Sequence, residues 1–157
     1  MTTTQPLLLL SMPSGGELLI ALLVCGLFLI PFILYLLTLQ NTLKLISPQN
    51  RKMEPSMVWL MFIPFFNMVW HFIIVNRLAD SLQDEYRHKA HPAEPRPTYN
   101  MGLAMCILFC CTWIPLLGGL VSLGALIVWI LYWVQVSGHR SKLQQLQFSS
   151  GGDSQIF

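Results

Sequence analysis

The sequence predicts an all-α integral membrane protein, built as a helical bundle with four hydrophobic helical segments. Two observations predict this class. Only 10% of the 157 residues are charged and 54% are hydrophobic, whereas soluble domains carry about 25% charged residues. All charged residues also lie outside three windows, 18–43, 55–76 and 97–139. Because a bilayer-spanning helix needs about 20 apolar residues, these windows have room for one, one and two segments.

The first segment, residues 17–39, follows an N-terminal tail, residues 1–16, whose proline, glycine and threonine content disfavours a helix. The segment is apolar on all sides, as expected for a helix surrounded by lipid or by other helices. It contains Pro31, which membrane helices tolerate. Because the tail lacks the basic residues of a signal peptide, we expect this segment to remain in the mature protein.

The second segment covers residues 56–76 and is expected to extend as a helix to about residue 88. Its middle contains Pro64 and Asn67, which predict a segment that is broken or re-entrant at Pro64–Asn67. The i,i+4 pair of Glu85 and Lys89 favours the helical extension. A proline-rich linker follows the extension.

The last window divides near Pro115, which leaves segments of about 100–114 and 118–137. Two apolar arms on either side of a helix break predict a helical hairpin. Residues 144–157 lack an apolar face, and we expect them to form a disordered C-terminal tail. The sequence thus predicts a single membrane domain over residues 17–143.

Two topologies are consistent with these segments. Lys and Arg concentrate on the cytoplasmic side of membrane proteins. If all four segments span the bilayer and the N-terminus lies inside, six of the nine basic residues lie on the cytoplasmic side. If segment 56–76 is re-entrant, all nine basic residues lie on the cytoplasmic side and the N-terminus lies outside. The charge count favours the re-entrant topology and the 22-residue uncharged window favours a span, so both stay open. Both place the C-terminus in the cytoplasm.

Three polar residues within the segments are candidates for a functional site. Asn67 and His71 would share one helical face, and with Gln135 of the last segment they form a hypothetical polar intramembrane site. We favour a structural interpretation, in which Asn67 caps the helix after the break and His71 makes one interhelical hydrogen bond. The uncharged windows hold no carboxylate to complete a proton relay.

Asp80, Asp84 and His88 lie at i, i+4 and i+8, a spacing that a divalent metal could use. Their basic neighbours favour instead a solvated helix with salt bridges. The expected partners are Arg77, Arg87 and Lys89. No phosphate-binding loop, catalytic triad or zinc-protease motif occurs in the sequence, so we predict no metal, no cofactor and no enzymatic activity. A net charge of +2 excludes a nucleic-acid surface.

Small residues at helical spacing predict close helix packing, within the monomer or between copies. They are Gly102, Cys106 and Cys110 in the third segment, Gly118 and Ser122 in the fourth, and Ala21 and Cys25 in the first. The four cysteines are expected to be reduced packing residues. Aromatic residues near segment ends are expected to anchor the protein at the membrane interface. Among them are Tyr35, Trp59, Tyr132 and Trp133.

The run from Trp59 to Trp70, with the core Ile63-Pro64-Phe65-Phe66-Asn67, is followed by an Arg-containing helix end at Arg77. It resembles small multi-pass bacterial membrane proteins of unknown function, which carry a similar Trp…Ile-Pro-x-x-Asn-Leu-x-Trp segment. The resemblance covers about residues 40–145. It implies a bacterial inner-membrane protein and no established role for any residue.

The sequence therefore predicts a non-enzymatic accessory or scaffold subunit of the cell inner membrane. Its partners would be the lipid bilayer and either further copies of itself or a larger membrane complex. The alternative is a small oligomeric channel or transporter whose polar site is formed by Asn67, His71 and Gln135.

Overall fold

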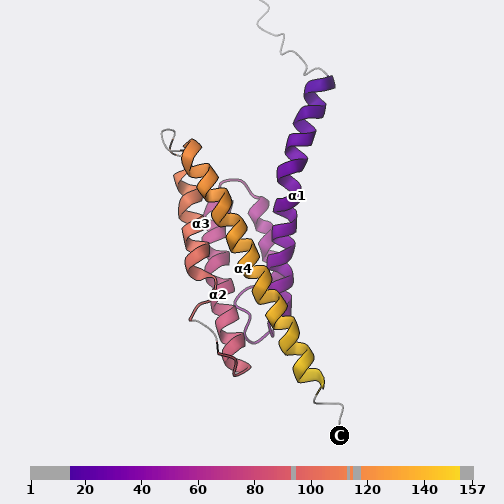
Figure 1. Cartoon of the computed structure of the whole chain (residues 1–157), viewed down its shortest axis with the longest axis vertical. Coiled ribbons are helices and arrows are strands. Elements are labelled where there is room, and N and C mark those ends of the chain that lie inside the picture. Colours follow the sequence, from indigo (N-terminus) through magenta and orange to yellow (C-terminus); the bar gives the residue numbers. More distant parts are fainter. Residues whose placement is uncertain (1–14, 93–94, 113, 115–117, 153–157) are drawn as a thin grey trace, which may run out of the picture. The chain divides into compact units, whose positions relative to one another are not determined.

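The computed structural model of the chain describes residues 15–92, 95–112, 114 and 118–152. Over these residues the protein is all-α, as predicted, with four α-helices, one 3₁₀-helix and no strand. The helices are α1 (Gly15–Leu45), η1 (Pro55–Phe62), α2 (Phe66–His88), α3 (Tyr99–Cys111) and α4 (Gly118–Gly152) (Figure 1).

The chain comprises two compact units, residues 1–34 and 35–157. The described part of the first unit is the N-terminal portion of α1, residues 15–34, and the remaining residues of α1 belong to the second unit. The single membrane domain expected over residues 17–143 stays a prediction.

The second segment is broken at the predicted place. Between η1 and α2, Phe65 adopts a φ of 64°, a conformation that non-glycine residues rarely adopt. Pro64 has no N–H group to satisfy. The backbone N–H groups of Ile63, Phe66 and Asn67 all donate to nearby carbonyls at 2.7 to 3.1 Å. The backbone N–H groups on either side of Pro64 and Phe65 therefore remain hydrogen-bonded at the break.

The break turns the segment into a hairpin of η1 and α2, which pack against each other. The ends of the two arms that lie away from the turn are joined, because the carbonyl of Lys52 accepts a hydrogen bond from Nη1 of Arg77 at 2.7 Å. The eight residues of η1 cover about 16 Å at ~2.0 Å per residue. The part of α2 from Phe66 to Arg77 covers about 17 Å at 1.5 Å per residue. Each arm is about half as long as the ~30 Å core of a bilayer.

Helix α3 packs against both α2 and α4 (Figure 1). The three helices meet at Gly102 of α3, where an added Cβ would lie 2.6 Å from Cγ1 of Val75 and 2.8 Å from Cε2 of Tyr132. The absence of a side chain at this position lets the three backbones approach closely. The packing of α3 on α4 confirms the predicted hairpin of the last two segments. Pro115, the predicted break, lies outside the described residues.

Helix α4 continues to Gly152, so the prediction of a disordered tail from residue 144 is wrong as far as residue 152. Residues 153–157 lie outside the described part of the chain. Tertiary contacts explain the longer helix. Leu143 is fully buried, and Nε2 of Gln147 donates a hydrogen bond to the carbonyl of Leu45 at 2.9 Å.

Candidate functional site

His71 of α2 is buried in an aromatic cluster within the second unit. Its Nε2 lies 2.9 Å from the hydroxyl of Tyr35, which is fully buried. The ring of Tyr35 also contacts three rings of α4, at centroid distances of 5.5 to 6.3 Å, namely Trp129, Tyr132 and Trp133. The interhelical hydrogen bond predicted for His71 is confirmed. The interfacial position predicted for Tyr35 and Tyr132 is wrong, because both are fully buried.

Neither of the other two candidate site residues forms a hydrogen bond with His71. Gln135 is exposed on α4, whereas Val136 beside it is fully buried. Asn67 is half-buried in the first turn of α2. Within the described ranges, neither side chain makes a hydrogen bond. The capping role predicted for Asn67 is also wrong, because Phe65 occupies the N-cap position.

The small residues of α3 pack as predicted near its start and less so towards its end. Gly102 forms the close contact with α2 and α4 described above. Cys106, one turn later, is 2% exposed, and Cys110 is half-buried. The small residues of α3 are therefore packed inside the protein at Gly102 and Cys106, but only partly at Cys110.

In α4 the two predicted packing residues differ. An added Cβ at Gly118 would lie 2.9 Å from the carbonyl oxygen of Thr112, so this glycine permits the close approach of the two chain segments. Ser122 is exposed, and its hydroxyl donates to the carbonyl of Gly119 in its own helix at 2.8 Å. Ser122 therefore does not pack within the monomer, and its packing between copies stays a prediction. Cys25 in the first unit is likewise exposed.

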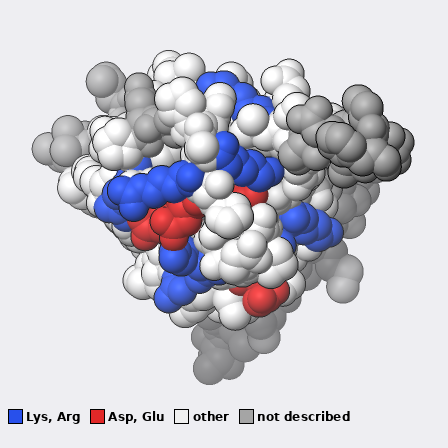
Figure 2. Space-filling model, turned by 90° about the horizontal axis from the view of Figure 1, so that it is seen from below, with Lys and Arg blue, Asp and Glu red and all other residues white. Residues whose placement is uncertain are grey.

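Charged side chains gather at one end of the second unit. We call this surface the charged end and define it by its paired residues, which are Lys52, Asp80, Asp84, Glu85, Lys89 and Arg96. Figure 2 looks onto it from below and shows blue and red side chains interspersed. Opposite charges are therefore neighbours on this face, and basic side chains cover more of it than acidic ones (Figure 2).

Glu85 is fully buried at the charged end. Its carboxylate accepts hydrogen bonds from the backbone N–H and hydroxyl of Ser47 at 3.1 and 3.0 Å and from Nδ2 of Asn50 at 2.7 Å. Nζ of Lys89 lies 3.3 Å away, which confirms the predicted i,i+4 pair. Burial raises the pKa of this carboxyl, but the hydrogen bonds from Asn50, Ser47 and Lys89 outweigh burial and lower the pKa below its ordinary value. The hydrogen bonds from Ser47 and Asn50 thereby hold the loop after α1 against α2.

The carboxylates of Asp80 and Asp84 pair with cations from distant parts of the chain. Oδ2 of Asp84 lies 2.6 Å from Nζ of Lys52, and Oδ1 of Asp80 accepts from Nε of Arg96 at 2.9 Å. The predicted salt bridges of this helix are present, but Asp80 and Asp84 do not pair with Arg77, Arg87 or Lys89. Of these three, Lys89 pairs with Glu85. Across the described ranges no group of three His, Cys, Asp or Glu side chains could hold a metal ion.

A further contact at this end joins α2 to α4. The hydroxyl of Tyr86 lies 2.8 Å from Nδ1 of His139. Burial raises the pKa of Tyr86 to about 12. The sequence carries no local signal for this pair, since the two residues are 53 positions apart.

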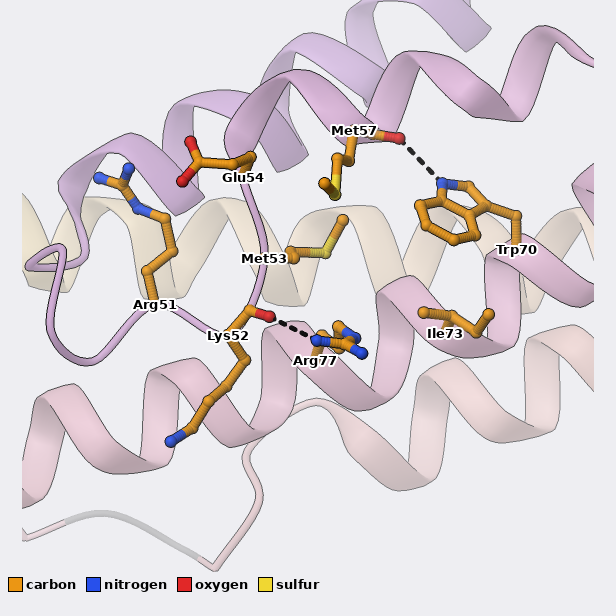
Figure 3. A pocket seen from close by; sticks show the side chains of 8 residues that line it. All are labelled: Arg51, Lys52, Met53, Glu54, Met57, Trp70, Ile73 and Arg77. Carbon is orange, nitrogen blue, oxygen red and sulfur yellow. Dashed lines mark hydrogen bonds between the residues drawn. The ribbon is translucent and has the colours of Figure 1, made fainter.

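A groove of about 460 Å³ lies where the loop before η1 meets α2 (Figure 3). Its charged lining residues are Arg51, Lys52, Glu54 and Arg77, and its apolar ones are Met53, Met57, Trp70 and Ile73. Nε1 of Trp70 donates to the carbonyl of Met57 at 2.8 Å. This hydrogen bond and the one from Arg77 to Lys52 join the two walls of the groove (Figure 3).

Sequence reasoning did not identify this groove, because Arg51 and Arg77 are far apart in the chain. They line one groove only because the second segment folds back. The signal that could have predicted it is the combination of a break at Pro64 with basic residues on both flanks of the same window.

Comparisons with protein-family models, with curated proteins and with solved structures found no match to this chain.

Proposed function

We propose that this chain is a multi-pass protein of the cell inner membrane and acts there as a non-enzymatic accessory or scaffold subunit. The observation that supports the membrane location most directly is the amount of exposed apolar surface. α1 and the part of α4 from Val121 to Ser149 are long and apolar enough to cross a membrane. In the most apolar window of α1 only 6% of the residues are buried. Exposed apolar surface of this extent is typical of contact with lipid or with partner proteins.

The second unit has such a surface of its own. Large apolar side chains are exposed on α4 and around the tip of the η1–α2 hairpin. They are Leu123, Leu126, Ile127, Ile130, Leu131 and Val134 on α4, and Phe62, Ile63, Phe65, Phe66 and Val69 near the tip. The charged end carries the ion pairs instead. A separation of apolar and charged surfaces along a helical unit fits a protein whose apolar part lies in lipid and whose charged end lies at the membrane surface.

The hairpin geometry supports the re-entrant topology over four full spans. If residues 55–76 crossed the bilayer, Lys52 and Asp84 would lie on opposite sides, yet their charged atoms are 2.6 Å apart. Both arms of the hairpin are also too short to span. By the positive-inside rule, the charged end and the C-terminus would face the cytoplasm, and the N-terminus would lie on the other side.

The aromatic cluster supports an accessory or scaffold role over the channel or transporter alternative. His71 is 8% exposed and its Nε2 is already paired with Tyr35. Gln135, the third residue of the hypothetical polar site, is exposed on α4. A conduction path would need these groups to line one water-filled space. The pair of His71 and Tyr35 instead resembles the polar contacts that hold membrane helices together.

Labelling with a membrane-impermeant maleimide tests the topology, after the four native cysteines are replaced by alanine. We expect Gln49→Cys and Ser141→Cys to react from the cytoplasmic side and Thr3→Cys from the other side. Gln49 and Ser141 are both exposed. Labelling of Gln49→Cys and Ser141→Cys from opposite sides would contradict the re-entrant topology, and labelling of all three from one side would contradict the spanning of α1.

Proteoliposomes test the functional class. We expect no solute or ion flux above that of empty liposomes, and co-purification of the native chain with a fixed membrane partner. Flux that is present with the wild type and lost in His71→Ala would contradict the scaffold role and favour the channel or transporter.

A further inference from the structure

We propose that the groove between residues 51–54 and α2 binds the phosphate headgroup of an anionic phospholipid. This proposal rests on the membrane location proposed above and names a ligand for one site at the membrane surface. Two features of the groove carry it: its cations retain N–H donors for an anion, and its apolar wall continues from those cations towards the hairpin tip.

The charge of the groove fits an anion. Three basic residues and one acidic residue line it, which gives a formal charge of +2. The ammonium of Lys52 is paired with Asp84, outside the groove. Arg51 and Arg77 are therefore the principal cations available to a ligand.

Both guanidinium groups have donors left over after their protein contacts. Nη2 of Arg51 donates to the carbonyls of Ile46 and Lys44 at 3.0 and 3.4 Å. Nε of Arg51 is buried and therefore closed to a ligand, which leaves Nη1 as the donor of this group. Arg77 uses Nη1 for the carbonyl of Lys52. A guanidinium carries five N–H donors and its planar fork matches phosphate oxygens, so either group can donate to a phosphate.

The apolar wall distinguishes a lipid from a free phosphate. Along α2, Ile73 lies about 6 Å from Arg77 and Trp70 about 10 Å from it, at 1.5 Å per residue. Both residues and Met57 line the same groove (Figure 3). They continue from the cations towards the apolar tip of the hairpin. A phospholipid would place its phosphate at the arginines and the start of its acyl chains along this wall, whereas free phosphate would leave the wall empty.

Lipid binding to the full chain in detergent micelles, followed by native mass spectrometry, tests the proposal. The probes are phosphatidylglycerol, phosphatidylcholine and inorganic phosphate. We expect the wild type to bind phosphatidylglycerol about tenfold more tightly than phosphatidylcholine. The double variant Arg51→Gln/Arg77→Gln should lose that preference through a fall of about tenfold in affinity for phosphatidylglycerol, since it removes the charge-assisted hydrogen bonds from the groove to the phosphate.

Two further variants separate a specific groove from general electrostatics and from misfolding. Arg87→Gln/Lys142→Gln removes the same charge from exposed residues outside the groove and should change the affinity by less than about twofold. Ile73→Trp fills the groove without removing any hydrogen bond that the arginines make. We expect it to weaken phosphatidylglycerol binding severalfold while helix content stays unchanged.

Three results would overturn the proposal. They are equal affinity of the wild type for the two lipids, an equal loss in both double variants, and full competition by inorganic phosphate with no effect of Ile73→Trp. The measurement is made in micelles and does not depend on topology. A failed lipid preference is thus distinguishable from a failure of the membrane location, which the maleimide labelling reports.

Discussion

At the scale of single residues, the buried polar groups of the second unit hold helices together. His71 and Tyr35 satisfy each other inside an aromatic cluster, and Glu85 is satisfied by a loop that arrives from another helix. Because an unpaired buried polar group costs free energy, each such pair makes the folded arrangement specific. Their contributions are measurable by substituting one partner at a time.

Tyr35→Phe removes the hydroxyl that meets Nε2 of His71 and leaves that nitrogen buried without its partner. We expect the free energy of unfolding in detergent micelles to fall by about 1–3 kcal/mol. Tyr99→Phe is the matched control, because the Tyr99 hydroxyl makes no hydrogen bond among the described residues and the phenyl ring would still lie under the guanidinium of Arg96. An equal effect of the two substitutions would contradict the role of the buried hydrogen bond.

Glu85 predicts a pH dependence of stability. Its pKa is lower in the folded chain than its ordinary value of 4.5, so its contribution is fully present above that value and is lost as the pH falls through the folded pKa. We expect the unfolding midpoint of the wild type to drop as the pH falls below 4.5. Glu85→Gln should be less stable at neutral pH and show a weaker drop. Glu54→Gln, at an exposed position, should keep the wild-type profile.

At the scale of elements, glycine and proline decide where helices approach and where they end. Pro64 was recognisable as a break from the sequence, because a proline in an apolar run interrupts the helical hydrogen bonds. That the chain reverses there, with Phe65 at positive φ, depends on the contacts of both arms. The sequence alone left a spanning helix and a hairpin equally open.

Gly102→Ala tests the contact of α2, α3 and α4. Its methyl group would collide with Val75 and Tyr132, and overpacking of this kind costs about 1–3 kcal/mol. Gly138→Ala on α4 serves as the control, because nothing lies within 4 Å of an added Cβ there. That substitution should be neutral or should stabilise the helix by up to about 1 kcal/mol. Thermal unfolding of both variants distinguishes the effect of overpacking from the effect of the higher helix propensity of alanine.

At the scale of the whole molecule, the proposed membrane location predicts where charge is tolerated. Leu126→Arg places a charge on the exposed apolar face of α4. If lipid covers this face, the substitution costs about 2.5–3.5 kcal/mol near the bilayer centre and the membrane-inserted fraction should fall. Ser141→Arg, exposed further along the same helix, should insert like the wild type. Equal insertion and unchanged stability of both variants would contradict contact of Leu126 with lipid.

The sequence by itself determined the helical class, the apolar helices and the break at Pro64, because composition and spacing are local properties that set hydrophobic length and backbone continuity. Only the tertiary structure decided that Lys52 meets Asp84, that Tyr35 is buried against His71, and that Arg51 and Arg77 line one groove. Each of these contacts joins residues distant along the chain. Their proximity follows from how the η1–α2 hairpin reverses and how the helices pack around Gly102, which no local pattern encodes.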